Sequence, residues 1–123
     1  MAFFKYGDKN IYYNETGAGS PVVLLHGDTA SSKMFEYIIP LYANRFRVIL
    51  MDFLGNGQSD RVEEFPPDLW YSQAQQVIAF LEYLDYGKVN LIGTSCGAWV
   101  AINAALERPD LVHKVVADSF DGR

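Results

Sequence analysis

Gly93-Thr94-Ser95-Cys96-Gly97 joins two segments of different character in this chain. The apolar run from Lys88 to Ile92 before it predicts a strand, and the small-residue run from Ala98 to Leu106 after it predicts a helix. A strand that turns at once into a helix places its middle residue on a cramped bend, so only small residues fit on either side. The bend turns the Ser95 hydroxyl outward, beside the first NH groups of the helix, which lack intrahelical partners. This geometry is typical of a nucleophile with donors ready for an oxyanion.

Two other interpretations of this segment are weaker. A glycine-serine surface loop would be flanked by polar turn residues, whereas Val89-Asn90-Leu91-Ile92 precedes this one. Cys96 is a rival nucleophile, because a helix N-terminus activates a thiol. The two glycines are centred on Ser95, however, so we expect Cys96 to contribute only its backbone NH.

Strand-like segments recur along the rest of the chain. The stretches from Ala2 to Tyr6 and from Asn10 to Glu15 predict a hairpin. The continuous apolar runs from Val22 to Leu25 and from Phe46 to Met51 predict strands that are buried on both faces. The run from Val112 to Ala117 predicts a further strand close to the end of the sequence.

Helices are predicted between the apolar strands. Ser31 or Ser32 is placed to cap a helix that extends through Tyr42. Ser72 and Gln75 form a capping box for a second, clearly amphipathic helix. Apolar strands separated by helices indicate an α/β fold, in which a mostly parallel sheet carries helices on both faces.

Composition limits the kinds of function that are open. The 123 residues, half of them apolar, suit one modest domain, so residues 1–123 are assigned to a single core. A net charge of −5 leaves no basic stripe for nucleic acid. Apolar runs fall far short of the ~20 residues of a membrane helix, and no signal-peptide pattern is present, so a cytoplasmic protein is expected. One cysteine without zinc-type companions, and glycines without dinucleotide spacing, predict neither metal nor cofactor.

The chain resembles the alpha/beta-hydrolase family over nearly all of its length. Three motifs carry the resemblance in the family's order: the oxyanion loop His26-Gly27, the turn Asp52-x-x-Gly55-x-Gly57-x-Ser59, and the nucleophile elbow from Gly93 to Gly97. The resemblance implies that Ser95 is the nucleophile and that the backbone NH groups of Asp28 and Cys96 form the oxyanion hole. It also implies a small-molecule acyl substrate and a reaction without metal or cofactor.

The loop from His26 to Ser32 is also similar to that of haloalkane dehalogenases and epoxide hydrolases. Those relatives carry an aspartate at the elbow. Ser95 therefore argues against both chemistries and favours an ester, thioester or amide bond as the target.

The family's catalytic triad is incomplete in this sequence. The family's histidine follows the last strand, so the chain resembles the N-terminal part of a core truncated after about the sixth strand. His26 lies in the oxyanion loop, where an imidazole more often braces backbone than accepts a proton. His113 precedes the last apolar run and is expected far from Ser95. Asp118 and Asp121 are more simply solvated turn carboxylates than the triad acid.

Two functions from different classes therefore stay open. In the first, the chain supplies the nucleophile of a serine hydrolase, and the acid and histidine come from a missing C-terminal half or a second chain. In the second, the chain is a non-catalytic member of the fold that binds a small ligand or a protein partner and keeps the elbow only as structure.

Overall fold

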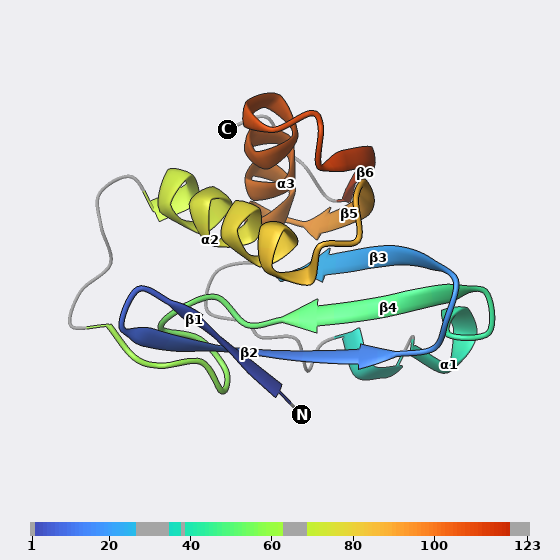
Figure 1. The fold of residues 1–123 in the computed structure, drawn as a ribbon, viewed down its shortest axis with the longest axis horizontal. Helices are drawn as coiled ribbons and strands as arrows, with labels where there is room; N and C mark the ends of the chain where they lie inside the picture. Colours follow the sequence, from blue (N-terminus) through green and yellow to red (C-terminus); the bar gives the residue numbers. More distant parts are fainter. Residues whose placement is uncertain (1, 27–34, 38, 63–68, 119–123) are drawn as a thin grey trace.

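The fold is a single six-stranded sheet with helices packed against it (Figure 1). The computed structural model describes residues 2–26, 35–37, 39–62 and 69–118, with only the backbone described at positions 70 and 118. The strands lie in the order β1-β2-β4-β3-β5-β6. In chain order the elements are β1 (Ala2–Tyr6), β2 (Lys9–Thr16), β3 (Ser20–Leu25), α1 (Ile39–Tyr42), β4 (Phe46–Met51), α2 (Leu69–Leu84), β5 (Val89–Thr94), α3 (Cys96–Glu107) and β6 (Val112–Asp118).

The sheet is mostly parallel, as the sequence predicts. Strands β4, β3, β5 and β6 run parallel to one another, whereas β1 pairs antiparallel with β2 and β2 pairs antiparallel with β4. The hairpin is closed by two residues, and the first of them, Gly7, takes a φ of 64°, which glycine adopts without strain. Parallel strands end at the same edge, so the segments that leave β3, β4 and β5 come together there.

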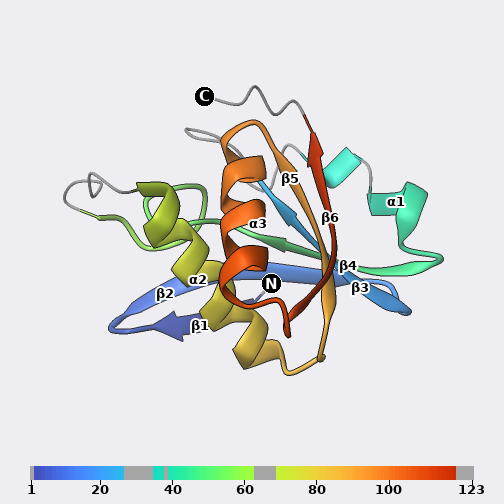
Figure 2. The same cartoon turned by 90° about the horizontal axis from the view of Figure 1, so that it is seen from above.

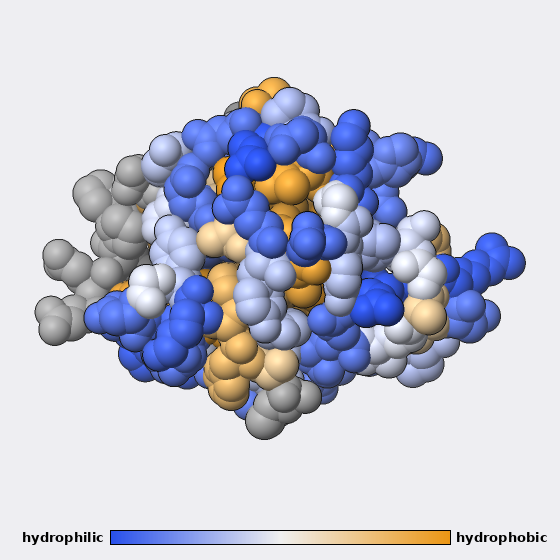
Figure 3. Space-filling model, viewed as in Figure 1, coloured by the Kyte–Doolittle hydropathy of each residue, from blue (hydrophilic) through white to orange (hydrophobic). Residues whose placement is uncertain are grey.

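Helices cover both faces of the sheet, and this prediction is also confirmed. Figure 2 shows α2 and α3 on one side of β5 and β6, and α1 on the other. Alternate residues of β3 point to the two sides: Val23 and Leu25 pack with α2 and α3, and Val22 and Leu24 pack with Phe35. The view in Figure 3 is mostly hydrophilic, with apolar colour in a few patches.

The predicted start of α2 is wrong. The helix begins at Leu69, so Ser72 lies inside its first turns and does not cap it. Serine is tolerated within a helix, and the capping-box pattern marks a start only where the preceding residues cannot be helical. The three residues before Ser72, at positions 69–71, can adopt helical conformation, and α2 includes them.

The predicted helix through Tyr42 is broken. Residues 35–37 form a 3₁₀ turn, and α1 is a separate helix of four residues, Ile39–Tyr42. Pro40 explains the break, because a proline ring clashes with the carbonyl four residues earlier and is accepted only in the first turn of a helix. The capping positions Ser31 and Ser32 lie outside the described residues.

Candidate active site

The nucleophile elbow forms as a strained turn between β5 and α3. Ser95 stands between the end of the strand and the first residue of the helix, with φ 56° and ψ −120°. Residues other than glycine rarely adopt positive φ, and such conformations persist only where the surrounding structure enforces them. Ser95 is nevertheless exposed. The turn therefore holds a serine outward at the carboxyl edge of the sheet.

Both glycines of the elbow are required by close backbone contacts. A Cβ atom on Gly93 would overlap the carbonyl group of Gly97, in the first turn of α3. A Cβ atom on Gly97 would overlap the carbonyl oxygen of Leu25, at the end of β3. The two glycines thus let α3 start directly against β5 and β3, and this packing fixes the direction in which Ser95 points.

The Ser95 hydroxyl does not cap the helix that it precedes. Ser95 occupies the N-cap position of α3 without a side-chain hydrogen bond to the helix, although its carbonyl accepts from Ala98 N at 3.0 Å. The first NH groups of a helix have no partner within it and carry partial positive charge. Cys96, half-buried with a free thiol, is the first residue of α3 and offers such an NH beside Ser95. The other predicted donor, Asp28, lies outside the described residues.

His26 is buried at the end of β3 and takes part in a defined backbone contact. Its side chain is 1% exposed, and its Nε2 atom accepts a hydrogen bond from Phe53 N at 3.1 Å. β3 lies next to β5, as expected, with Leu25 opposite Gly93. The lone pair of Nε2 is therefore used by the backbone of residue 53, which favours the bracing role over the role of base.

The second histidine, His113, is exposed near the start of β6. The register pairs Val112 with Val89 and Ala117 with Gly93, so His113 is at the end of the sheet opposite to the elbow. The sequence contains two histidines in all. Neither of them has its imidazole placed as the base of Ser95. Of the carboxylates weighed as triad acid, Asp121 lies outside the described residues and Asp118 is described only by its backbone.

The turn after β4 is a folded loop whose motif residues bond to one another. Asp52, 1% exposed, accepts from Gln58 N at 3.0 Å, and a Cβ atom on Gly57 would overlap its carboxylate. Ser59 Oγ accepts from Tyr12 N at 2.8 Å and donates to the carbonyl of residue 52. Each polar residue of the motif thus has a structural task, and the loop is fixed to β2.

Burial and two acidic side chains influence Tyr12, whose backbone NH is bound by this loop. Burial, followed by the negative charges of Asp52 and Glu36, raises the pKa of the Tyr12 hydroxyl. The phenol consequently stays protonated at neutral pH.

Among the residues that the structure describes, no group of three or more His, Cys, Asp or Glu side chains could hold a metal ion.

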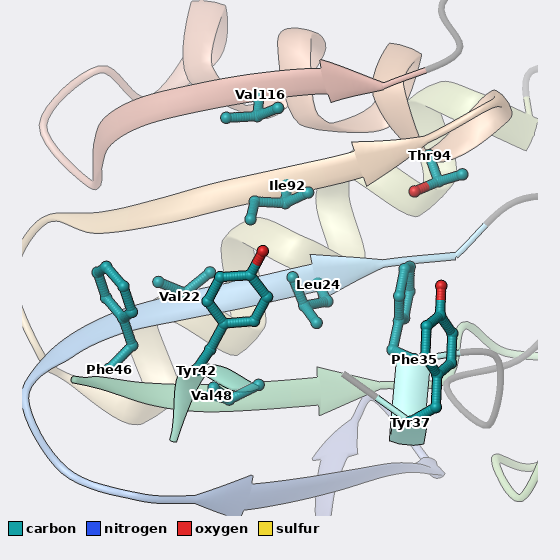
Figure 4. A pocket seen from close by; sticks show the side chains of 10 residues that line it. All are labelled: Val22, Leu24, Phe35, Tyr37, Tyr42, Phe46, Val48, Ile92, Thr94 and Val116. Atoms are coloured by element: carbon teal, nitrogen blue, oxygen red, sulfur yellow. The ribbon is translucent and has the colours of Figure 1, made fainter. Parts of the chain in front are cut away.

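An apolar groove was not predicted from the sequence. It has a volume of about 430 Å³ and lies on the face of the sheet opposite to α2 and α3 (Figure 4). Thr94, the neighbour of Ser95, lies at the carboxyl end of β5 at one end of the groove, and Val116, at the edge strand β6, is 53% exposed. The signal was present in the sequence, because β3 is apolar on both faces and Ile92 of β5 lies on the groove side, while Pro40 shortens the helix on that side. Its lining residues are Val22, Leu24, Phe35, Tyr37, Tyr42, Phe46, Val48, Ile92, Thr94 and Val116.

A parallel sheet whose strand-to-helix turn carries an exposed, strained serine defines a class of α/β proteins built like hydrolases. Residues 20–120 match the family described as alpha/beta hydrolase fold, and the chain belongs to this family. No helix in the described part of the chain is long and apolar enough to cross a membrane.

Individual relatives agree with the family assignment. The chain is 31% identical over 121 residues to 2-hydroxy-6-oxo-6-(2'-aminophenyl)hexa-2,4-dienoic acid hydrolase of Metapseudomonas resinovorans, covering 93% of this chain and 40% of that protein. It is 33% identical to a haloalkane dehalogenase of Agrobacterium fabrum, and the match covers 85% of this chain and 34% of that protein. The solved structure of Est816, described as an N-acyl homoserine lactone degrading enzyme, superposes with a TM-score of 0.88 at 25% identity, covering 97% and 45%. The chain thus spans less than half the length of these relatives.

Proposed function

We propose that this chain supplies the nucleophile of a serine hydrolase that cleaves ester, thioester or amide bonds through an acyl-enzyme. One observation carries the proposal: Ser95 is exposed, with φ 56° and ψ −120°, at the start of α3. A turn that costs conformational energy and leaves a hydroxyl at a helix N-terminus, without capping that helix, serves chemistry better than it serves stability.

The proposed reaction has two halves. A histidine from outside residues 1–123 takes the proton of Ser95 Oγ, and the oxygen attacks the substrate carbonyl carbon. The resulting oxyanion is held by the backbone NH groups of Cys96 and Asp28. The tetrahedral intermediate collapses, the leaving group takes the proton from the histidine, and the acyl group stays on Ser95. The same histidine then takes a proton from water as the water oxygen attacks the acyl carbon. The bond from that carbon to Ser95 Oγ breaks, Oγ takes the proton back from the histidine, and the freed acid leaves.

The choice of acyl chemistry over dehalogenation rests on the residue at the elbow. A carboxylate nucleophile displaces halide by attack of its oxygen on carbon, and water then attacks the carboxyl carbon of the ester formed. Serine at position 95 forms an acyl ester from a carbonyl substrate instead. The similarity to a haloalkane dehalogenase therefore concerns the scaffold, whereas the lactone-degrading Est816 is the more apt guide to the substrate class.

The second candidate is a non-catalytic protein of this fold that binds a ligand or partner. The observation that favours it is the placement of the two histidines, since His26 Nε2 accepts from Phe53 N and His113 is at the far end of the sheet. Under this alternative the elbow is retained only because the packing of α3 on β3 and β5 depends on it.

Labelling with a fluorophosphonate probe separates the two candidates. The probe phosphonylates an activated serine, and mass spectrometry of the digested protein locates the modified residue. We expect the intact protein to be modified at Ser95 and the Ser95→Ala variant to be unmodified. Ser20→Ala is the matched control, because Ser20 is an exposed serine at the start of β3, the end of that parallel strand away from the elbow. Absence of labelling at Ser95 in the intact protein would favour the binding protein.

A further inference from the structure

We infer that His26 is a positioning residue for the elbow: its neutral imidazole fastens the chain leaving β4 to the end of β3, against which the first turn of α3 is packed. The kinetic part of this inference rests on the proposed function. The structural part stands on the contacts of His26, Phe53 and Gly97.

The hydrogen bond defines the protonation state of His26. Phe53 N lies 3.1 Å from Nε2, and the imidazole is 1% exposed. A backbone N–H is only a donor, so Nε2 must be an acceptor without a proton. The ring is therefore neutral with its hydrogen on Nδ1, and a proton added at Nε2 would face another donor.

The segment after β4 that His26 binds is also held by α2. Phe53 is fully buried, and its ring meets the imidazole edge-on at a centroid distance of 4.8 Å. The next residue, Leu54, donates its NH to Oε1 of Gln76 on α2 at 3.0 Å. His26 thus joins the end of β3 to a segment that α2 already holds in place.

The backbone of the same histidine touches the elbow. A Cβ atom added to Gly97 would lie 2.7 Å from His26 O and would overlap Leu25 O. The carbonyls of residues 25 and 26 therefore rest against the first turn of α3, two residues beyond Ser95. A shift of His26 would displace this turn and its NH donors, and misplacement of a reacting group by about 1 Å costs about 100-fold in rate.

Two simpler roles predict different behaviour. If His26 only filled space, a leucine of similar size would preserve the elbow. If His26 were the base, glutamine would fail as completely as leucine. A positioning residue behaves differently from both, because the amide oxygen of glutamine can accept from Phe53 N whereas leucine cannot.

The first test measures the reactivity of Ser95 in the intact protein. The rate of phosphonylation by a fluorophosphonate is compared in the wild type, His26→Gln and His26→Leu, with folding checked by circular dichroism. We expect His26→Leu to slow labelling about 10- to 100-fold and His26→Gln to retain most of the rate. His113→Gln is the matched control, because His113 is the exposed histidine far from the elbow. The inference would be overturned if His26→Leu were labelled at the wild-type rate, or if His26→Gln were labelled as slowly as Ser95→Ala.

The second test does not depend on activity. Nitrogen-15 NMR of labelled histidine reports the tautomer directly, and hydrogen exchange reports the protection of the Phe53 amide. We expect His26 to carry its proton on Nδ1 and the Phe53 amide to lose protection in His26→Leu but not in His26→Gln. A proton on Nε2 of the wild type would refute the positioning role of His26 even if the leucine variant failed to fold. If the wild type carried the His26 proton on Nδ1 but Ser95 did not react with the probe, the proposed function would fail and the structural role of His26 would stand.

Discussion

The contact between α3 and β3 makes Gly97→Ala the most informative substitution outside Ser95. Alanine is normally preferred to glycine within a helix by about 1 kcal/mol, so a substitution in α3 would ordinarily stabilise the protein. Here the new methyl group would overlap Leu25 O and approach His26 O, and both are backbone atoms that cannot rotate away. Forcing an extra carbon into a packed site costs about 3 kcal/mol at the upper end of the usual range. The expected net loss is about 2 kcal/mol.

Urea unfolding of the intact protein measures this loss. A matched control is Gly87→Ala, because Gly87 also lies beside β5, has φ 75° and has no atom within 4 Å of an added Cβ. Gly87→Ala should lower the free energy of unfolding by about 1 kcal/mol through backbone conformation alone. It should leave the rate of Ser95 labelling unchanged. Gly97→Ala should lower both stability and the labelling rate. If Gly97→Ala were as stable as the wild type, the close approach of α3 to β3 would be refuted.

Three further outcomes are expected. Ser59→Ala should lower the free energy of unfolding by about 1–3 kcal/mol, because it leaves Tyr12 N without its acceptor, and an unchanged urea midpoint would contradict that role. The hydrogen bond between the Tyr13 and Tyr83 hydroxyls at 3.2 Å, followed by burial, raises the pKa of Tyr13 to about 12, so this contribution to stability is present below pH 10.0 and is lost as pH rises through about 12. Ultraviolet titration should find Tyr83→Phe lowering that value, and no change would be evidence against the pairing. The 123-residue chain should self-associate in light scattering through the β6 edge and the groove beside it, and Val116→Lys should reduce this, whereas a monodisperse monomer would argue against an exposed docking face.

The parts of the fold that the sequence predicts best are those with strong local constraints. β4 agrees residue for residue with the apolar run from Phe46 to Met51, and the strand-turn-helix at Gly93 to Gly97 forms as expected. Both depend on neighbours in sequence: a buried strand needs a continuous apolar run, and a tight turn needs small residues.

Helix boundaries were less predictable, because tertiary packing and proline decide them. The serine at position 72 had the right spacing for a cap, yet α2 starts earlier at Leu69. Pro40 was visible in the sequence, and its steric effect on the preceding turn could have predicted the short α1. The Phe53 hydrogen bond of His26 joins residues 27 positions apart and has no local sequence signal.

The role of Ser95 as nucleophile would be tested best by a structure of the intact protein after reaction with a fluorophosphonate. We expect a phosphorus atom bonded to Ser95 Oγ, with the phosphoryl oxygen within hydrogen-bond distance of Cys96 N and Asp28 N. Phosphorus on another side chain, or a phosphoryl oxygen turned away from the start of α3, would contradict it.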